Sequence, residues 1–591
     1  MKPELYSRFP LTLSGADFEP PVAPDIPISN EQTAVSDAKR PRLDDSPTIQ
    51  KVVSHQPTCE LSVLTSNVCP KLRKAQLSSI VTKCTHQELV YLSEIIEPLL
   101  KRDFIKHLPV EISLHILSYL PVADILNCTQ VSSDWHRIAS DPLLWYRFCK
   151  RDGIIEANVS KSQACACSTA DNDEVENIQT NPSPSKHVEH DWKATYRYSL
   201  ELRCNWLNGS PWPQLVVPAH HNHVITCLEV FENWAITGSD DSSLSIWNLL
   251  DGKLLITLFG HIGGVWSLTV LHPMAHLSSP LLVSGSCDRT ARVWALDGSH
   301  WPCLTTLFGH QSTVRCLAGQ LKSEEPTINL DSKVMAPDAL VVTGSRDTTL
   351  RLWDALSGRC LHVLEGHIGA VRCVQFCGSV IVSGSYDCTV RVWCSRSGRC
   401  THVLDEHQNR VYKLLFDGTR IISASLDTTI CVWDSQSGAL KHKFCGHQSL
   451  TSEMAYGHAQ RILVSSNADE TIRIWDVENG ECLHVLAGRN KHESAVTCVQ
   501  LTRHFIISSG DDGIVKLWDR NTGSYIRDLV QLEGARRGGV IWRIVASESR
   551  LVCAAGSRNG LETTKLIILT FGPEKTEAGT MHSCRIKTTC T

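Results

Sequence analysis

The C-terminal part of the chain repeats one short pattern of small, polar and apolar positions. Seven times between residues 236 and 519, a turn of small residues is followed by an Asp and, five or six residues later, by a Trp. The clearest copies are Ser284–Asp288 with Trp294, Thr343–Asp347 with Trp353, and Ser383–Asp387 with Trp393. A period of about 40 residues predicts a repeat architecture in which each copy is one supersecondary unit.

Most copies open with a Gly-His pair, as at Gly309–His310 and Gly366–His367. With the Asp and the Trp, this pair resembles the WD-repeat signature, in which each copy is one four-stranded blade of a β-propeller. The His, the turn Asp, a Ser or Thr and the Trp indole can then form a buried chain of hydrogen bonds. We therefore expect a scaffold role, not catalysis or metal binding, for His261, His310, His367, His407, His447, Asp288, Asp347, Asp387 and Asp427.

The pattern extends to an eighth blade. After the seventh Trp, Ala555–Asn559 repeats the turn and Leu566–Phe571 reads as the next strand, but this copy has no Trp. The segment Pro213–Pro218 lies just before the first His position, where other copies place the outer strand of a blade. It can complete the eighth blade and close the ring, which removes exposed sheet edges.

Two helical patterns precede the repeats. In Gln87–Leu100, an apolar stripe of Leu89, Leu92, Ile96 and Leu99 falls on one helical face. Residues 104–150 then read as a compact all-helical unit that opens with Leu108-Pro109 and ends near Trp145. About 45 residues bury little surface, so we expect part of this unit to complete its packing against a partner.

Composition narrows the class of protein. A chain of 591 residues is too long to fold around a single hydrophobic core. Its net charge of −5 provides no overall positive potential that would attract nucleic acid. No apolar signal or membrane-spanning run is present, which predicts a cytosolic or nuclear protein. The 25 Cys residues lie mostly singly, and Cys165 with Cys167 are too few for a zinc site. Residues 1–75 read as a disordered tail, in which Lys39–Arg42 is either a nuclear import signal or a solvated charge cluster.

The helical unit and the repeats together resemble a known family. Leu108-Pro109, Leu114–Leu120, Trp135 and Leu144-Trp145 are similar to an F-box. An F-box followed by WD repeats resembles the substrate receptors of Skp–cullin–F-box ubiquitin ligases. Segments such as His223–Leu228, Asn409–Tyr412, Gly446–Ser452 and Gly556–Gly560 resemble the archipelago-type receptors, which recognise phosphorylated cyclin E, Notch and Myc.

The register of the repeats predicts a binding site independently of the family resemblance. Equivalent positions of successive blades form rings around the channel mouth. The first position follows the Val that lies four residues past each His, and its residues are Ile225, Trp266, Arg315, Arg372, Tyr412 and Thr497. The second position directly precedes each turn Asp, or the Asn that replaces it, and its residues are Asp240, Cys287, Arg346, Tyr386, Leu426, Ala468, Asp511 and Arg558. Arg315, Arg346 and Arg372 thus come from neighbouring blades, with Arg289 on the same side. Guanidinium groups without paired acids favour phosphate oxygens, so the cluster predicts a phosphopeptide site. The alternatives are solvated loop charges, or nucleic acid, which needs a longer basic track.

The resemblance implies the same pocket in more detail. Arg315, Arg346 and Arg372 match the central phosphothreonine clamp of the archipelago-type receptors, and Ser312, Thr313 and Arg289 match their second anionic subsite. The residues that match the flanking contacts of these receptors are Tyr386, Tyr412, Arg558, Trp266 and Trp542. Cys287 stands where the family has a Thr, and a thiol is a poorer hydrogen-bond donor than a hydroxyl.

We therefore predict a mostly β protein with an eight-bladed WD-repeat propeller behind a small all-α F-box. The expected boundaries are a disordered tail at 1–75, a dimerisation segment at 76–101, the F-box at 102–150, a helical linker with a disordered insertion at 151–212, the propeller at 213–572 and a disordered tail at 573–591. The expected function is that of a non-catalytic ligase receptor without cofactor or metal, in nucleus and cytoplasm. Its expected partners are the Skp adaptor, and through it cullin and RING subunits, with phosphorylated substrates.

The resemblance also implies which residues meet the protein partners. Leu108, Pro109, Ile112 and Leu117 are expected at or beneath the adaptor-facing surface. The stripe of Leu89, Leu92, Ile96 and Leu99 is expected to form a homodimer, although packing on the F-box of the same chain would bury it equally well. No membrane or nucleic acid is expected as a partner. The alternative function is a phosphopeptide-binding WD-repeat scaffold outside any ligase.

Overall fold

The structure is a computed structural model of the whole chain, and it divides into two compact units, Met1–Arg102 and Asp103–Thr591. It describes residues 70–100, 103–155, 190–209, 214–271, 279–298, 300–321, 339–458, 461–557 and 563–572. Residues 1–69 and 573–591 of the predicted tails, the insertion in the linker, Lys39–Arg42, Cys165, Cys167 and Arg558 lie outside these residues. The predicted boundary of the first tail is wrong, because residues 70–75 form the start of a helix. None of the helices that the structure describes combines the length and apolar character needed to span a bilayer.

The first unit contains helices α1 (Pro70–Val81) and α2 (His86–Leu100). A capping box begins α2, because the Thr85 backbone N–H donates to the Glu88 carboxylate at 2.7 Å and the Glu88 N–H donates to the Thr85 hydroxyl at 3.4 Å. The exposed fractions of Leu89 and Ile96 are 37% and 43%. The predicted helix is therefore confirmed, and within its own unit its apolar stripe remains accessible.

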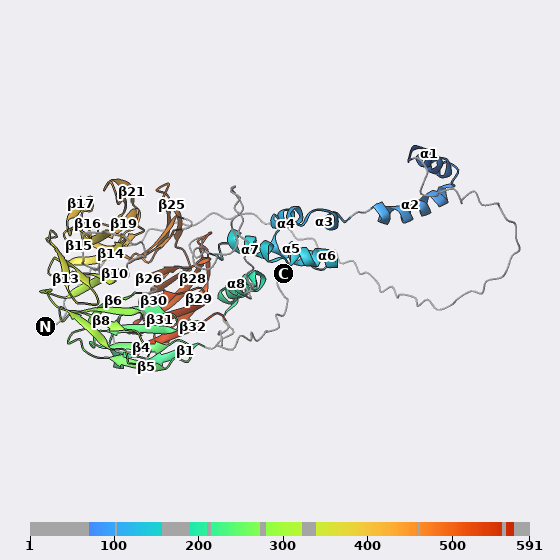
Figure 1. Cartoon of the computed structure of the whole chain (residues 1–591). Helices are drawn as coiled ribbons and strands as arrows, with labels where there is room; N and C mark the ends of the chain where they lie inside the picture. Colours follow the sequence, from blue (N-terminus) through green and yellow to red (C-terminus); the bar gives the residue numbers. More distant parts are fainter. Residues whose placement is uncertain are drawn as a thin grey trace, which may run out of the picture. The chain divides into compact units, whose positions relative to one another are not determined.

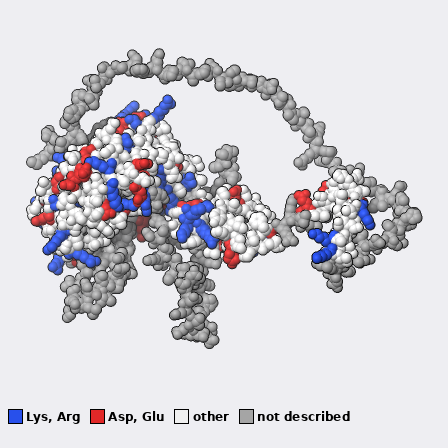
Figure 2. All heavy atoms as spheres, turned by 90° about the horizontal axis from the view of Figure 1, so that it is seen from above, with Lys and Arg blue, Asp and Glu red and all other residues white. Residues whose placement is uncertain are grey.

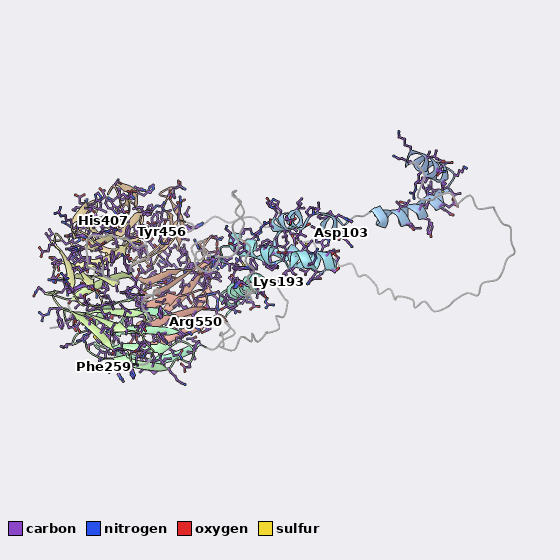
Figure 3. All side chains as sticks on the ribbon, in the orientation of Figure 1. Asp103, Lys193, Phe259, His407, Tyr456 and Arg550 are labelled. Carbon is purple, nitrogen blue, oxygen red and sulfur yellow. The ribbon has the colours of Figure 1, made fainter. Side chains whose placement is uncertain are left out.

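The second unit begins with the helical domain that the sequence predicts. Short side chains cap its helices: Asp103 and Ser132 accept the backbone N–H groups of Lys106 and Trp135, and Asp141 precedes a Pro at the first helical position. Asp103, labelled in Figure 3, also accepts the Trp135 indole N–H at 2.9 Å. The helices are α3 (Phe104–His107), α4 (Val110–Ser118), α5 (Val122–Cys128), α6 (Ser133–Ala139) and α7 (Pro142–Arg151).

Helix α8 (Trp192–Asn208) contacts both the helical domain and the repeats. Near its start, Tyr196 is buried in the helical core and donates a hydrogen bond to Asp152 at 2.5 Å, while Lys193 (Figure 3) donates to Ser140 at 3.3 Å. Near its end, the Trp206 ring stacks on Phe571 with centroids 3.7 Å apart. One continuous helix therefore joins the two cores, as expected of a stiff linker.

The repeats form eight four-stranded antiparallel sheets, the blades of a β-propeller (Figure 1). The blades, each named by its first strand, begin with β2 (Ile225–Phe231), β6 (Val265–Leu271), β10 (Val314–Leu321), β14 (Val371–Cys377), β18 (Val411–Phe416), β22 (Thr451–Gly457), β26 (Val496–Leu501) and β30 (Gly539–Ala546). The second strands are β3 (Trp234–Ser239), β7 (Leu281–Ser286), β11 (Ala339–Ser345), β15 (Val380–Ser385), β19 (Arg420–Ser425), β23 (Ile462–Asn467), β27 (Phe505–Gly510) and β31 (Arg550–Ser557). The third strands are β4 (Leu244–Asn248), β8 (Ala291–Ala295), β12 (Leu350–Asp354), β16 (Val390–Cys394), β20 (Ile430–Asp434), β24 (Ile472–Asp476), β28 (Ile514–Asp519) and β32 (Lys565–Thr570). The outer strands are β5 (Leu254–Leu258), β9 (Cys303–Leu307), β13 (Cys360–Leu364), β17 (Cys400–Leu404), β21 (Leu440–Phe444), β25 (Cys482–Leu486), β29 (Tyr525–Gln531) and β1 (Leu215–Pro218).

The ring closes as the sequence predicts. Strand β1, from the start of the repeat region, pairs with β32 from its end, with Leu215 opposite Ile568 (Figure 1). The hydrophobic core lies between blades; in one cluster Leu350 and Leu352 of one sheet pack with Val371 and Trp393 of the next. Because every blade needs its neighbour to bury its faces, ring closure also stabilises the first and last blades.

Candidate functional site

A buried hydrogen-bonded brace fixes each loop that carries a candidate site residue. In the β14 blade, the His367 ring donates from Nδ1 to Asp387 at 2.7 Å, and its Nε2 lies 2.8 Å from the Ser383 hydroxyl. That hydroxyl oxygen accepts the Trp393 indole N–H at 2.9 Å. The same arrangement recurs at His261, His310, His407 and His447 with Asp288, Asp347, Asp427 and Asp469, and the structure adds His220 with Asp241 and His492 with Asp512. These groups satisfy one another, as the scaffold role predicts.

The first strand of every blade carries a β-bulge at one register position. The pairing shifts between Val314 and Cys316 and between Val371 and Cys373, so Arg315 and Arg372 are bulged residues. A bulge turns the strand locally and re-aims the extra side chain. The other bulged residues are Thr226, Trp266, Tyr412, Ser452, Thr497 and Trp542.

One sequence prediction in this ring is wrong by a residue. Ile225 was expected to be equivalent to Trp266, but Ile225 pairs with Ser239 as Val265 pairs with Ser286, so the equivalent residue is Thr226. The reason is the short 3-10 turn at His220–Asn222, which adds one residue between the His and the strand.

Along the channel lies a cavity of about 420 Å³ that the bulged residues help to line. Trp266, Arg315 and Arg372 of the predicted site reach it. The Arg315 guanidinium stacks over the Trp266 ring at 4.1 Å, and Arg372 lies 5.9 Å from the centroid of Tyr412. Aromatic faces thus hold two cations from neighbouring blades at one cavity.

The positive charge of this cavity is not balanced locally at Arg315 and Arg372. Burial, together with the nearby Arg372, lowers the pKa of Arg315 to about 10, so it stays charged at neutral pH. Among the residues the structure describes, no carboxylate forms an ion pair with either arginine, and Arg372 Nε is buried without a hydrogen-bond partner. An anion with several acceptor oxygens would satisfy these donors.

Of the remaining predicted residues, Tyr412 and Trp542 belong to the ring of bulged residues, and the other described ones lie on loops beside it. Cys287 accepts the Trp266 indole N–H at 2.7 Å, and the Thr313 hydroxyl lies 3.8 Å from the same sulfur. The Tyr386 and Tyr412 rings are 5.3 Å apart, and Arg346 donates its backbone N–H to Thr313 at 3.0 Å. Arg289 and Arg346 have exposed side chains, and Ser312 and Trp542 are half-buried. The cavity that Arg315 and Arg372 reach is not lined by Arg289, Ser312 or Arg346 in the described part of the chain.

The sequence analysis missed four charged residues that line the same cavity, namely Glu229, Lys413, Glu453 and Arg543. Lys413, Glu453 and Arg543 each follow a bulged residue directly, where other blades have Cys or Ser. A comparison of the residues directly after the bulge in each blade would have found Lys413, Glu453 and Arg543 from the sequence. On the propeller face seen in Figure 2, basic and acidic side chains are interspersed, so no long basic track crosses the described part of that face.

Comparison with protein-family models identifies both halves of the architecture. The F-box-like model matches residues 105–151. The model "WD domain, G-beta repeat" matches seven segments: 212–248, 252–295, 301–354, 358–394, 398–434, 438–476 and 480–519. The first three strands of the eighth blade, whose third strand β32 lacks the Trp of the other copies, lie outside these matches, and only its outer strand β1 falls within 212–248.

Similar proteins combine the same two parts. The F-box/WD repeat-containing protein sel-10 of Caenorhabditis elegans is 40% identical over 81% of this chain and 80% of its own length. Cell division control protein 4 of Saccharomyces cerevisiae is 29% identical over 52% of this chain and 43% of its own length. A protein of Arthroderma benhamiae named "Probable E3 ubiquitin ligase complex SCF subunit sconB" is 27% identical over 51% of this chain and 49% of its own length. The match therefore spans less than two thirds of the two fungal relatives.

Proposed function

Because this chain belongs to the family of F-box and WD-repeat proteins, we propose that it is the substrate-recognition subunit of a Skp–cullin–F-box ubiquitin ligase. In this role the F-box binds the Skp adaptor, and the propeller binds a phosphorylated segment of the substrate. The chain itself is not a catalyst. It raises the effective concentration of substrate lysines at a ubiquitin-conjugating enzyme that the complex supplies.

The observation that carries the proposal is the pair of arginines at the channel cavity. Arg315 and Arg372 approach from neighbouring blades, are held by aromatic rings and have no carboxylate partner among the described residues. Phosphothreonine supplies about two negative charges and three acceptor oxygens at one point. Lone carboxylates of a substrate would satisfy fewer of these donors, so the site favours a phosphorylated peptide over its unmodified form.

The helical domain has the apolar surface that an adaptor requires. The exposed fraction of Ile112 is 47%, and Phe104 and Leu143 are 51% and 62% exposed. Pro109 is exposed beside the half-buried Leu108, whereas Leu117 is 1% exposed and supports the surface from beneath. Burial of such side chains contributes about 25 cal/mol per Å² to association, which supports a stable partner at this surface.

The first unit supports a proposed homodimer through α2. Leu89 and Ile96 of the predicted stripe are exposed, Leu92 is half-buried, and Tyr91 and Ile95 add 63% and 42% exposed side chains. The side chain of Leu99 lies outside the described residues. Two receptors in one assembly would offer two phosphopeptide sites, which increases avidity for multiply phosphorylated targets.

The class of substrate in this proposal follows the archipelago-type resemblance. Phosphorylated proteins of the cyclin E, Notch or Myc type, acting in nucleus and cytoplasm, would be bound and directed to degradation. A phosphopeptide-binding scaffold would share the pocket, but the helical domain next to the propeller favours the ligase receptor.

The test is binding of a phosphothreonine peptide and its unmodified twin to the full chain in complex with the Skp adaptor. Arg315→Ala and Arg372→Ala should each weaken phosphopeptide binding by about 2 kcal/mol, roughly thirtyfold in Kd, because charge-assisted hydrogen bonds are lost. Arg359→Ala, an exposed arginine outside the cavity, serves as the matched control and should bind like the unmutated chain. Equal binding of the two peptides, or unchanged binding by the Arg315, Arg346 and Arg372 triple alanine variant, would refute the proposal.

A further inference from the structure

The position that directly follows the bulged residue of each blade has an uneven composition around the propeller. The residues that follow the bulge in each blade are Cys227, Ser267, Cys316, Cys373, Lys413, Glu453, Cys498 and Arg543. Five of these are small and only weakly polar, whereas the β18, β22 and β30 blades carry charges. All eight line the channel cavity that Arg315 and Arg372 also reach.

The three charged residues form one network around Glu453. One carboxylate oxygen pairs with Lys413 Nζ at 2.5 Å, and the other lies 3.6 Å from Arg543 Nη1. Arg543 Nε donates to the backbone carbonyl of Thr226 at 3.2 Å, which fixes the guanidinium against the neighbouring β2 blade. The Glu453 side chain is 15% exposed, so solvent screens its charge only in part.

The charges of the cavity can be counted from its lining. Four cations, Arg315, Arg372, Lys413 and Arg543, face Glu453 and Glu229. Because burial raises the pKa of Glu229 to about 7, this carboxyl carries about half a charge at pH 7, so 4 − 1 − 0.5 leaves about 2.5 net positive charges. A phosphothreonine carries about −1.5 to −2 at neutral pH. Without Glu453 the same cavity would hold about 3.5 net positive charges at pH 7, more than one phosphate neutralises.

We infer that Glu453 is a specificity-determining residue, which sets the charge of the cavity to match a single phosphate group and holds Lys413 and Arg543 away from other anions. The inference rests on the proposed phosphopeptide function. Arg315 and Arg372 supply the attraction in this scheme, and Glu453 limits it. Acidic unphosphorylated segments then bind poorly, because the cations that remain open require a compact dianion.

A purely structural role of the network would have a different signature. If Glu453 served only to hold Lys413 and Arg543 in place, loss of either end of the Lys413–Glu453 pair would loosen the channel and weaken binding in the same direction. If Glu453 sets the charge, loss of the carboxylate and loss of the ammonium group change affinity in opposite directions. The sign of the two effects therefore separates the roles.

The experiment measures Kd for a phosphothreonine peptide and a twin with Glu at that position, using the full chain in complex with the adaptor. Glu453→Gln should tighten phosphopeptide binding about fivefold, tighten the Glu twin more and steepen the salt dependence. Lys413→Gln should weaken phosphopeptide binding about fivefold, and the double variant should return close to the unmutated chain. Glu453→Asp keeps the negative charge and should preserve the ratio of the two affinities. This variant also provides the test if Glu453→Gln impairs folding.

The inference is overturned if Glu453→Gln binds the phosphopeptide no more tightly than the unmutated chain, or if Glu453→Asp and Glu453→Gln behave alike. Arg315→Ala, measured in parallel, separates this failure from that of the proposed function. If Arg315→Ala loses phosphopeptide binding while Glu453→Gln changes nothing, only the charge-setting role fails. If Arg315→Ala also binds normally, the phosphopeptide site itself is wrong.

Discussion

Removal of one brace carboxylate should destabilise the propeller by a predictable amount. Asp387 accepts four hydrogen bonds: from His367 Nδ1 at 2.7 Å, from the Ile368 N–H at 3.0 Å, and from the N–H and hydroxyl of Thr389 at 2.9 and 2.7 Å. Its side chain is 2% exposed and that of His367 is fully buried. Asp387→Ala leaves the buried His367 donor with only the Thr389 hydroxyl, 3.3 Å away, and frees the turn that carries Tyr386.

The size of the effect follows from the bonds lost. A hydrogen bond to a charged group contributes about 1.5–3 kcal/mol, and an orphaned buried donor costs about 1–3 kcal/mol. Since Ile368 and Thr389 can recruit water, we expect a total loss of about 3 kcal/mol. At about 2.1 cal/mol/K per residue, a cooperative unit of about 360 residues shifts by about 1.3 °C per kcal/mol, so Tm should fall by about 4 °C.

The pH dependence provides a second readout. Burial raises the pKa of Asp387, but the hydrogen bonds from His367 and Thr389 outweigh it and hold the pKa well below its ordinary value of 3.8. A carboxylate with a lowered folded-state pKa stabilises the protein above its unfolded pKa, and this contribution is lost as the pH falls through the folded-state value. The penalty of Asp387→Ala should therefore be full at pH 7 and shrink below about pH 4.

Thermal unfolding of the chain at pH 7 and at pH 3.5 checks both expectations. Asp427→Ala, in the next blade, should lower Tm by a similar amount, because its carboxylate makes the same contacts with His407 and Thr429. Asp240→Ala, an exposed Asp outside any brace, should change stability by less than about 0.5 kcal/mol. A Tm shift for Asp387→Ala no larger than that of Asp240→Ala would refute the reasoning.

Three further outcomes are expected. Deletion of residues 104–150 should abolish co-purification with the Skp adaptor and spare phosphopeptide binding; loss of both in a folded protein would contradict the division of labour. Residues 76–591 bound to adaptor should scatter light as twice the protomer mass, and Leu92→Glu with Ile96→Glu should halve it, whereas a monomeric mass for the unmutated complex at micromolar concentration would exclude the dimer. Burial raises the pKa of Glu229 to about 7, so as the pH rises through 7 its new charge should weaken phosphopeptide binding relative to Glu229→Gln. Parallel pH profiles for the two proteins would show that Glu229 does not act on the site.

The resemblance of the pocket to the archipelago-type receptors leaves one position open to measurement. Cys287 lies between Trp266 and Thr313 and receives the Trp266 N–H at 2.7 Å. A hydroxyl at this position would be a better donor to a second anionic group than the thiol. The contact with Trp266 nevertheless keeps the side chain at the rim of the site, where the sequence register places it.

The features that each repeat carries locally could be predicted from the sequence alone. The His, Asp and Trp spacing predicted the braces of the β6, β10, β14 and β18 blades and the His447 end of the brace in the β22 blade, because four groups within one repeat satisfy one another. The closing strand at Pro213–Pro218 could also be predicted, since an unpaired sheet edge in the last blade requires a partner.

How the side chains of different blades combine could not be predicted from the sequence, because it depends on the closed ring. The extra residue in the turn at His220–Asn222 moved the ring position from Ile225 to Thr226, which periodicity could not detect. Glu453 contacts Lys413 from the neighbouring blade and Arg543 from another, 40 and 90 residues away in the chain (453 − 413 and 543 − 453). A repeat specifies its own turn and strands, whereas the charge of the central cavity is a sum over all blades that exists only once the ring has closed.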